Sequence, residues 1–373
     1  MPAASPIRRC FPVAAAQQAY ADCLASAGLA AQALQYSISE GYLPLRQWIA
    51  ARMAGLGVPA AADNILITSG SQQALEFLGR LLLSADDTAL VTAPTYLGAL
   101  QAFSSAEPRY DRLRPEDGNR TPAAYAEAAA EAGGEVKLAY VVPDFANPTG
   151  QTLSIAARER LLDLAAELDI AVIEDAAYAA LRFGGDALPA IQALDVARTG
   201  SLDRSRVIYC GTFSKTLSPG LRVGWICASE RIIRRLVLIK QASDLNSSLI
   251  NQIVMHRLAE ATYDGQVARA RAHYSKRRES MLAALARHMP DGTAWTRLDG
   301  GLFVWVTLPE GLDGAELLHR SLEEAKVAFV PGAAFFADGS GRNTIRLSYS
   351  LPDEATIEAG IARLGRLVAE LPG

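Results

Sequence analysis

Lys215 lies in a polar loop between two apolar stretches of the chain. Residues 207–210 and 223–227 are apolar and short, which predicts two buried strands with a loop at 211–222 between them. Burial in a protein interior lowers the pKa of an amine, and the neutral amine that results is reactive toward carbonyl groups. Lys215 is therefore the first candidate for a catalytic residue. The remaining lysines have polar or helical surroundings, where we expect solvated surface amines: Lys137, Lys240, Lys276 and Lys326.

Other side chains with chemical potential directly follow predicted strands. Apolar runs at 65–68, 88–92, 138–142 and 170–173 predict strands, and the residues after them are Ser69, Gly70, Ser71, Tyr96, Asn147, Asp175 and Tyr178. Ligands of α/β sheets bind beyond the carboxyl ends of the strands. Because the loop that holds Lys215 also follows a strand, the pattern predicts one shared site.

The elements that must position this site alternate between strand and helix. This alternation predicts an α/β fold, with a mainly parallel sheet covered by helices on both faces. Beyond residue 230 we expect two or three long helices to residue 288. A smaller α+β domain follows, with strands within 294–308 and at 327–330 and 344–349, and helices at 314–324 and 354–370. We assign residues 37–270 to the large domain, and residues 1–36 together with 271–373 to the small one.

Composition excludes several classes of function. The chain has 373 residues, half of them hydrophobic, and a net charge of −4, which argues against a nucleic-acid partner. Its four cysteines have neither CxxC nor His-paired spacing, so we expect no disulfide framework, no metal site and a cytoplasmic location. There is no apolar run of about 18 residues, so we expect no membrane partner.

The residues at the strand ends match the parts of one cofactor. The turn at 69–71 precedes a predicted helix, whose N-terminus can hold a phosphate. Asp175 at the end of a buried strand needs a cationic or protonated partner. Together with the amine of Lys215 and the flat ring of Tyr96, these groups fit pyridoxal phosphate, which forms a Schiff base with lysine and pairs its pyridine nitrogen with an Asp.

Each residue taken singly also has a simpler explanation. Asp175 could cap a helix that starts at Ala176. The tyrosines could be ordinary half-buried aromatic residues, and Arg346 could form an ion pair on a strand face. The sequence around Lys215 superficially resembles the end of a Walker A motif, but the required Gly-Lys pair is absent. Their joint occurrence in one predicted crevice favours the shared site.

Seven segments carry a resemblance to a known family, and the match as a whole spans residues 34–373 almost continuously. The sequence resembles the fold-type I pyridoxal-phosphate aminotransferases of class I/II, and among them the 2-aminoadipate (LysN-type) branch. The segments are SGSQQAL at 69–75, PTYLGALQAF at 94–103, NPTG at 147–150, EDAAY at 174–178, GTFSKTLSPGLRVGW at 211–225, GGLFVW at 300–305 and NTIRLSYS at 343–350.

The resemblance implies a role for each site residue. Lys215 would be the Schiff-base lysine and then the acid and base of the proton shift. Asp175 would keep the pyridine nitrogen protonated. Tyr178 and Asn147 would hydrogen-bond the phenolic oxygen, and Tyr96 would stack on the ring. The phosphate ligands would be Ser71, Gln72, Thr212, Ser214 and Arg222.

The resemblance also implies contacts beyond the cofactor. Arg346 would grip the substrate α-carboxylate as a bidentate fork, with Asn147 as a second substrate contact. Tyr36 would reach the phosphate of a neighbouring subunit, which implies a homodimer with shared active sites. Two departures stand out. The glycine-containing lid upstream of the first helix is missing or different, and Asp144 with Ala146 precedes Asn147. We expect Asp144 to add a carboxylate near the site and to disfavour acidic substrate side chains.

The function implied is an aminotransferase. An L-amino acid would give its amino group to the cofactor, and a 2-oxo acid, with 2-oxoglutarate as the expected acceptor, would take it by a ping-pong mechanism. Another reaction of the same cofactor, such as β-elimination or decarboxylation, would use the same residues. A MocR-like regulatory domain is disfavoured because no basic DNA-binding domain precedes residue 13. The pattern does not indicate which amino acid is the donor.

Overall fold

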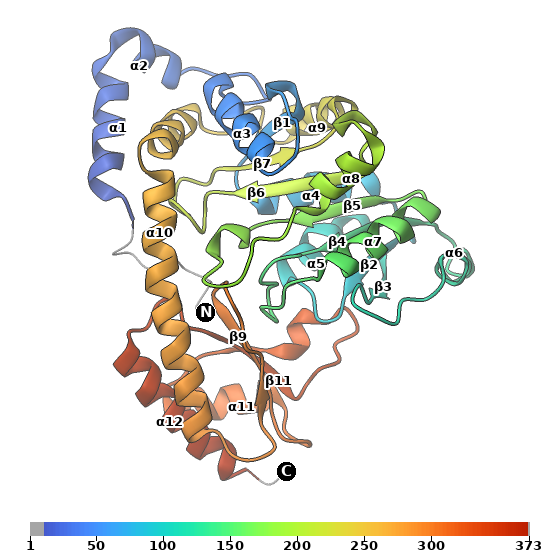
Figure 1. Cartoon of the computed structure of the whole chain (residues 1–373), viewed down its shortest axis with the longest axis vertical. Coiled ribbons are helices and arrows are strands. Elements are labelled where there is room, and N and C mark those ends of the chain that lie inside the picture. Colours follow the sequence, from blue (N-terminus) through green and yellow to red (C-terminus); the bar gives the residue numbers. More distant parts are fainter. Residues whose placement is uncertain (1–10, 372–373) are drawn as a thin grey trace.

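A seven-stranded sheet forms the centre of the larger part of the molecule (Figure 1). The computed structural model describes residues 11–371. Across the sheet the strands lie in the order β1 (Ile65–Thr68), β7 (Gly224–Cys227), β6 (Val207–Thr212), β5 (Ala171–Asp175), β4 (Val136–Val141), β2 (Thr88–Thr92) and β3 (Arg109–Leu113). Within this sheet β7 runs antiparallel to both of its neighbours, and the other adjacent pairs are parallel. The predicted, mainly parallel sheet is confirmed.

Helices cover both faces of this sheet, which explains why its central strands are largely apolar. One face packs against α4 (Ser71–Leu82), α5 (Leu97–Phe103) and α9 (Glu230–Ser243). The other face packs against α3 (Leu43–Gly55), α6 (Pro122–Glu131), α7 (Ile155–Glu167), α8 (Ile191–Thr199) and the first half of α10 (Leu249–His288). Successive strand residues alternate between the two faces: Leu138 and Tyr140 contribute to one core, Ala139 and Val141 to the other.

A four-stranded antiparallel sheet forms the smaller part. Its strands lie in the order β10 (Val330–Pro331), β11 (Thr344–Ser348), β9 (Phe303–Thr307) and β8 (Ala294–Trp295). Its helices are α11 (Gly314–Arg320), continued by a π-helical turn at Ser321–Ala325, and α12 (Glu354–Ala369). This arrangement confirms the smaller α+β unit.

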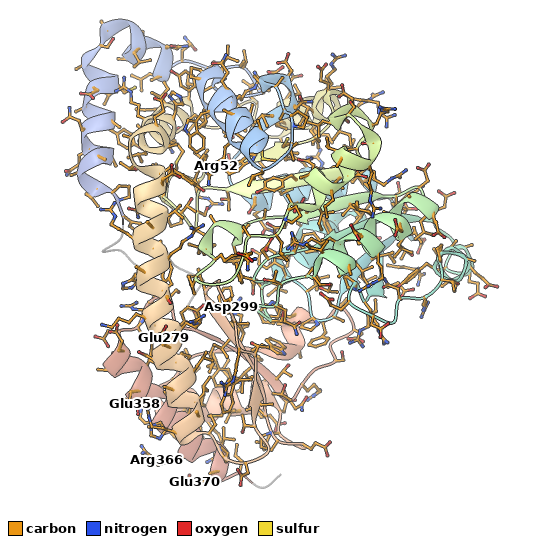
Figure 2. All side chains as sticks on the ribbon, in the orientation of Figure 1. Arg52, Glu279, Asp299, Glu358, Arg366 and Glu370 are labelled. Atoms are coloured by element: carbon orange, nitrogen blue, oxygen red, sulfur yellow. The ribbon has the colours of Figure 1, made fainter. Side chains whose placement is uncertain are left out.

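The 40-residue helix α10 runs along both parts of the molecule (Figure 1). Near its end α10 packs beside α12, which carries Glu358 (Figure 2). Glu358 accepts hydrogen bonds from Arg287 and from His288 Nε2, the latter at 2.7 Å. At its start α10 contacts α1 (Val13–Ala25) and α2 (Ala27–Ala33), where Cys23 and Ala33 share one apolar cluster with Leu249. The assignment of residues 1–36 to the small domain and the division near residue 270 both stay predictions.

Two elements were not predicted. The edge strand β3 has exposed and half-exposed charged side chains, so it lacks the apolar alternation that indicates a strand. Helix α8 is short, and its first two backbone N–H groups donate to the buried carboxylate of Glu174. Residues 13–33 form two helices, α1 and α2, which are separated at Ser26. Within residues 11–371, no helix combines the length and the apolar character needed to cross a membrane.

Candidate active site

Apart from Tyr36, all the residues to which the resemblance gives a role line one cavity of about 400 Å³, whereas Ser69 and Gly70 lie just outside its lining. The cavity lies where the carboxyl ends of β2, β4, β5 and β6 meet β11 of the small sheet. The residues that it brings together are Ser71, Gln72, Tyr96, Asn147, Asp175, Tyr178, Thr212, Ser214, Lys215, Arg222 and Arg346. The predicted convergence at the strand ends is therefore found in the structure.

Lys215 follows β6 in a loop that is held by its own hydroxyl groups. Thr212 Oγ1 donates to Ser214 Oγ at 2.9 Å and accepts from the Ser214 backbone N–H at 3.1 Å. Burial, together with the positive charges of Arg346 and Arg222, lowers the pKa of Lys215 to about 8, against the opposing effect of Asp175. The amine therefore has a substantial neutral fraction near neutral pH, which is the form that attacks a carbonyl carbon.

Asp175 is the last residue of β5, and its carboxylate is buried. Tyr140 donates its hydroxyl to Asp175 Oδ2 at 2.9 Å, whereas Oδ1 is buried without a hydrogen-bond partner in the part of the chain described. Burial raises the pKa of this carboxyl to about 6. A ligand N–H donor would satisfy Oδ1 and stabilise the charged form. The capping alternative is wrong, since no α-helix begins at Ala176.

Arg346 reaches the cavity from β11 and lies close to two aromatic rings. Its guanidinium carbon lies 4.1 Å from the ring centre of Phe303 and 5.1 Å from that of Phe335. Nη1 donates to Asn147 Oδ1 at 2.6 Å, and Nε is buried with no acceptor among the residues described. Asn147 also bonds to the Tyr178 hydroxyl, and burial raises the pKa of that tyrosine. A carboxylate is the natural acceptor for the remaining donors of a buried guanidinium.

The turn before α4 has the geometry of an anion site. Gly70 has a φ of 91°, and a Cβ there would collide with Arg222 Nη2, so a side chain at this position would displace the arginine. Arg222 Nη2 donates to the Ser69 carbonyl at 3.1 Å. A Cβ at Gly224 would lie 2.8 Å from the Ser71 nitrogen. These close contacts place a guanidinium and two hydroxyl-bearing loops beside the first N–H groups of a 12-residue helix, where a phosphate is stabilised.

Gln72 holds the aromatic wall of the cavity. Its Nε2 donates to the Gly98 carbonyl at 2.6 Å, and its Oε1 accepts from the Tyr96 hydroxyl at 3.3 Å. A Cβ at Gly98 would collide with the Tyr96 ring, so glycine allows the ring to lie flat over the start of α5. The Gln72 side chain therefore fixes Tyr96. The backbone N–H of Gln72, in the first turn of α4, is the group of this residue that can face an anion.

Asp144 and Tyr36, two residues with an expected role at the site, both lie outside the cavity lining. Asp144 is not among the residues that line the cavity, and its Oδ1 pairs with Arg158 Nη2 at 3.0 Å and Arg182 Nη2 at 2.8 Å. Because two cations neutralise it, the expectation that it adds a free carboxylate to the site is wrong. The side chain of Tyr36 is 78% exposed and lies outside the cavity of its own chain. Its contact with a neighbouring subunit stays a prediction.

Several residues that line the cavity, and one that supports it from behind, were not predicted from the sequence. Tyr140 supports Asp175 from a strand read as purely apolar, and its hydroxyl was the one signal that could have indicated a buried polar partner. The others are apolar or small residues with no chemical signature of their own: Leu97, Gly98, Val142, Ala177, Pro219, Val330 and Phe335, together with Gln101.

Comparison with known proteins identifies the family. The family model described as aminotransferase class I and II matches residues 8–364. The chain is 40% identical to an aromatic-amino-acid aminotransferase of Thermococcus litoralis, over 91% of this chain and 81% of that protein. It is also 40% identical to the 2-aminoadipate transaminase of Thermus thermophilus, over 98% of this chain and 89% of the relative.

The protein belongs to the class I and II aminotransferases. Among solved structures, the α-aminoadipate aminotransferase LysN of Thermus thermophilus superposes with a TM-score of 0.88 and 39% identity, over 98% of this chain and 91% of the other. That structure contains N-(5'-phosphopyridoxyl)-L-leucine. Both the resemblance and the fold-type I architecture expected from the sequence are confirmed.

Family membership also confirms the expected cofactor, pyridoxal 5'-phosphate. The residues of this cavity fit it on two structural grounds. The buried, unpartnered Oδ1 of Asp175 matches a protonated pyridine nitrogen. The turn at Gly70, with Ser71 and Arg222 beside it, matches the phosphate.

Proposed function

We propose that this aminotransferase moves an amino group from an L-amino acid to a 2-oxo acid, with 2-oxoglutarate as acceptor, in the two half-reactions of a ping-pong mechanism. One observation carries the proposal. A single cavity holds a lysine of lowered pKa, a buried carboxylate with an unpartnered oxygen and an arginine with an unpartnered Nε, each within the part of the chain described. The names of the two relatives, both transaminases, support it.

The chain's own residues would bind and orient the cofactor. Pyridoxal phosphate supplies an electron sink that stabilises negative charge at the substrate Cα. Asp175 Oδ1 would accept a hydrogen bond from the pyridine N–H and keep that nitrogen protonated. Tyr96 would stack on the ring, and Ser71 and Arg222 would hold the phosphate, with Gln72, Thr212 and Ser214 beside them.

Lys215 would both attach the cofactor and move the proton. Its Nζ would hold the cofactor covalently in the resting enzyme. As a neutral amine, Lys215 Nζ would be the base that takes the proton from the substrate Cα, and as the resulting ammonium it would be the acid that gives this proton back. Arg346 would hold the α-carboxylate, with Asn147 beside it, so that Cα lies within reach of Lys215.

A homodimer with shared sites belongs to the same proposal. Four apolar side chains between residues 34 and 43 are largely exposed, and Tyr36 is among them: Leu34, Tyr36, Ile38 and Leu43. Such a patch is typical of a surface that another protein covers. The expected partner is a second copy of this chain, to whose phosphate Tyr36 would donate. Light scattering of the purified protein at known concentration tests this, and a monomer would contradict it. A cytoplasmic location stays a prediction from the sequence.

The two half-reactions can be tested separately. Adding an amino donor without an oxo acid should convert the bound cofactor to its amino form, seen as loss of the absorbance of the resting enzyme. Adding 2-oxoglutarate should then restore that absorbance and produce glutamate. A lyase would instead release ammonia and an oxo acid such as pyruvate with no need for an acceptor. That result would overturn the proposed reaction while leaving the cofactor assignment intact.

A further inference from the structure

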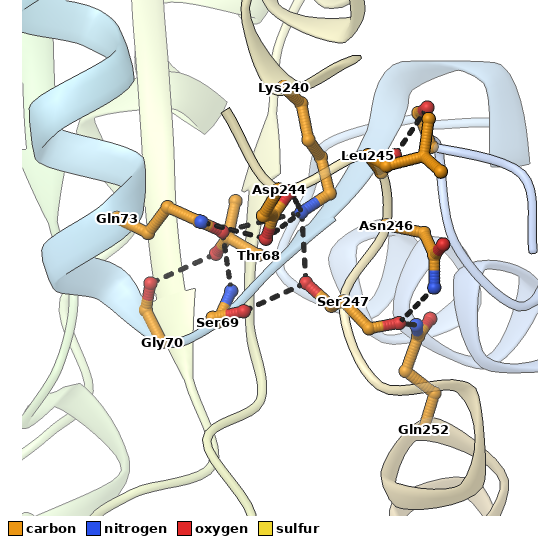
Figure 3. Close-up of polar contacts among 11 residues, drawn as sticks. Thr68, Ser69, Gly70, Gln73, Lys240, Asp244, Leu245, Asn246, Ser247 and Gln252 are labelled. Atoms are coloured by element: carbon orange, nitrogen blue, oxygen red, sulfur yellow. Dashed lines mark hydrogen bonds and ion pairs between the residues drawn. The ribbon is translucent and has the colours of Figure 1, made fainter. Parts of the chain in front are cut away.

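A buried polar network lies behind the turn at Ser69–Ser71, and none of its central members lines the cavity (Figure 3). At its centre is Lys240 of α9, which is fully buried, so the expectation of a surface amine here is wrong. Lys240 Nζ donates to both carboxylate oxygens of Asp244, at 2.8 and 2.9 Å, and to Ser247 Oγ at 2.9 Å. It also lies 3.4 Å from Gln73 Oε1.

This network fixes the residue that starts the turn, Ser69. The Ser69 backbone N–H donates to Gln73 Oε1 at 2.8 Å, and its hydroxyl lies 3.0 Å from Ser247 Oγ. Its carbonyl accepts from Arg222 Nη2 at 3.1 Å. The backbone N–H and the hydroxyl of Ser69 are thus held by Gln73 and Ser247, two side chains that Lys240 contacts (Figure 3). The carbonyl of Ser69 is held by Arg222, which lines the cavity.

The partners of Lys240 are themselves fixed, which makes the network a rigid support. Gln73 Nε2 donates to Asp244 Oδ2 at 2.9 Å. The Ser247 carbonyl accepts from Gln252 Nε2 at 2.9 Å and from Asn246 Nδ2 at 3.1 Å. A buried ammonium destabilises the fold unless its hydrogen bonds are satisfied, and an apolar side chain would fill the same space without that cost. A fully satisfied network of this kind specifies one geometry.

We propose that Lys240, acting through Gln73 and Ser247, positions the phosphate-binding turn. It holds Ser69 so that the first N–H groups of α4, the Ser71 hydroxyl and Arg222 converge on the cofactor phosphate. Lys240 itself contacts neither cofactor nor substrate, so it is a positioning residue. This inference rests on the assignment of the turn at Gly70 as the phosphate site, which belongs to the proposed function.

The decisive comparison is between pyridoxal phosphate and pyridoxal, which lacks the phosphate. Cofactor-free full-length protein is titrated with each compound, and binding is followed by absorbance. Lys240→Met should weaken pyridoxal phosphate binding at least tenfold, because charge-assisted contacts that hold the turn are lost. Pyridoxal binding should change less than twofold. The matched control is Lys276→Met, which removes an exposed lysine 3.5 Å from Glu354 and should leave both affinities unchanged.

Ser247→Ala gives an independent measurement if Lys240→Met does not yield folded protein. This change removes the contact with Ser69 Oγ and should lower the preference for pyridoxal phosphate over pyridoxal about fivefold. Equal weakening of both compounds, or no weakening of either, would show a purely structural role and overturn the proposal. If the unmodified protein bound both compounds equally well, the phosphate assignment would be wrong, and this proposal with it.

Discussion

Replacing Arg346 by lysine separates the charge of the guanidinium from its shape. The charge remains, but lysine has no planar fork and cannot pair with both oxygens of a carboxylate. In the structure Nη1 is engaged with Asn147 and Nε has no acceptor among the residues described, so a substrate carboxylate would add hydrogen bonds to an already oriented group. The rings of Phe303 and Phe335 also lose the planar guanidinium that lies 4.1 and 5.1 Å from their centres.

The size of the effect follows from the number of hydrogen bonds lost. A hydrogen bond to a charged group contributes about 1.5–3 kcal/mol, and about 1.4 kcal/mol corresponds to a factor of ten. Loss of one of the two bonds in the fork should therefore lower kcat/KM of the amino donor about tenfold to hundredfold. Because the carboxylate is held in both the ground state and the transition state, most of the loss should appear as a higher KM.

Steady-state kinetics with a saturating oxo acid measure this effect. Arg342→Lys is the matched control, since the Arg342 side chain is 72% exposed, pairs with Asp313 and precedes the same strand. Cofactor affinity should be unchanged in both variants. A donor KM for Arg346→Lys within twofold of the unmodified enzyme would refute the assignment of Arg346 to the carboxylate.

Three further predictions concern buried charges. Burial raises the pKa of Asp175 from 3.8 to about 6. The folded apoprotein therefore binds a proton on this carboxyl more tightly than the unfolded chain does. This proton stabilises the fold below about pH 4, and the stabilisation is lost as the pH rises through 6. Asp175→Asn apoprotein should therefore be more stable than the unmodified apoprotein at pH 8, by up to about 3 kcal/mol in denaturant titrations, and not at pH 4; an equal difference at both pH values would contradict this. Burial lowers the pKa of Lys215 to about 8 from 10.5, so the rate at which apoprotein captures pyridoxal phosphate in stopped-flow absorbance should rise through pH 8, whereas a midpoint near 10 would show an ordinary amine. Asp144→Asn should destabilise the fold by about 3 kcal/mol, because it removes the charge that neutralises buried Arg158. The ratio of kcat/KM for glutamate to kcat/KM for leucine should not change. A changed ratio with unchanged stability would show that Asp144 acts on the substrate.

The position of the cavity was largely predictable, because most of its polar residues lie close in sequence to the ends of recognisable strands. Asn147, Asp175 and Lys215 each follow an apolar strand within a few residues, and parallel strands bring their carboxyl ends together whatever the long-range packing. Arg346 could be located by the resemblance alone, since its strand belongs to the other sheet. Phe335 and Val330 had no signal, because their approach to the cavity depends on how the two sheets pack.

For Lys240 the prediction was wrong for a different reason. A lysine in a helix suggested a solvated surface amine. Its position on the helix indicates burial, because Leu236 and Val237 are buried on α9 and Lys240 follows them by four and three residues, on the same helix face. Helical periodicity was thus the better predictor of burial than residue type. The edge strand β3 had no comparable pattern, because its side chains are mostly exposed or half-exposed and several are charged.

Covalent trapping tests most directly whether Lys215 is the residue that binds the cofactor. The holoenzyme is treated with borohydride, digested and mapped by mass spectrometry, and the chain has only five lysines to distinguish. We predict one phosphopyridoxyl group, on the peptide that contains Lys215, and none in the Lys215→Ala variant. A label on any other lysine, or an equal label in the variant, would contradict the assignment of Lys215 to the cofactor.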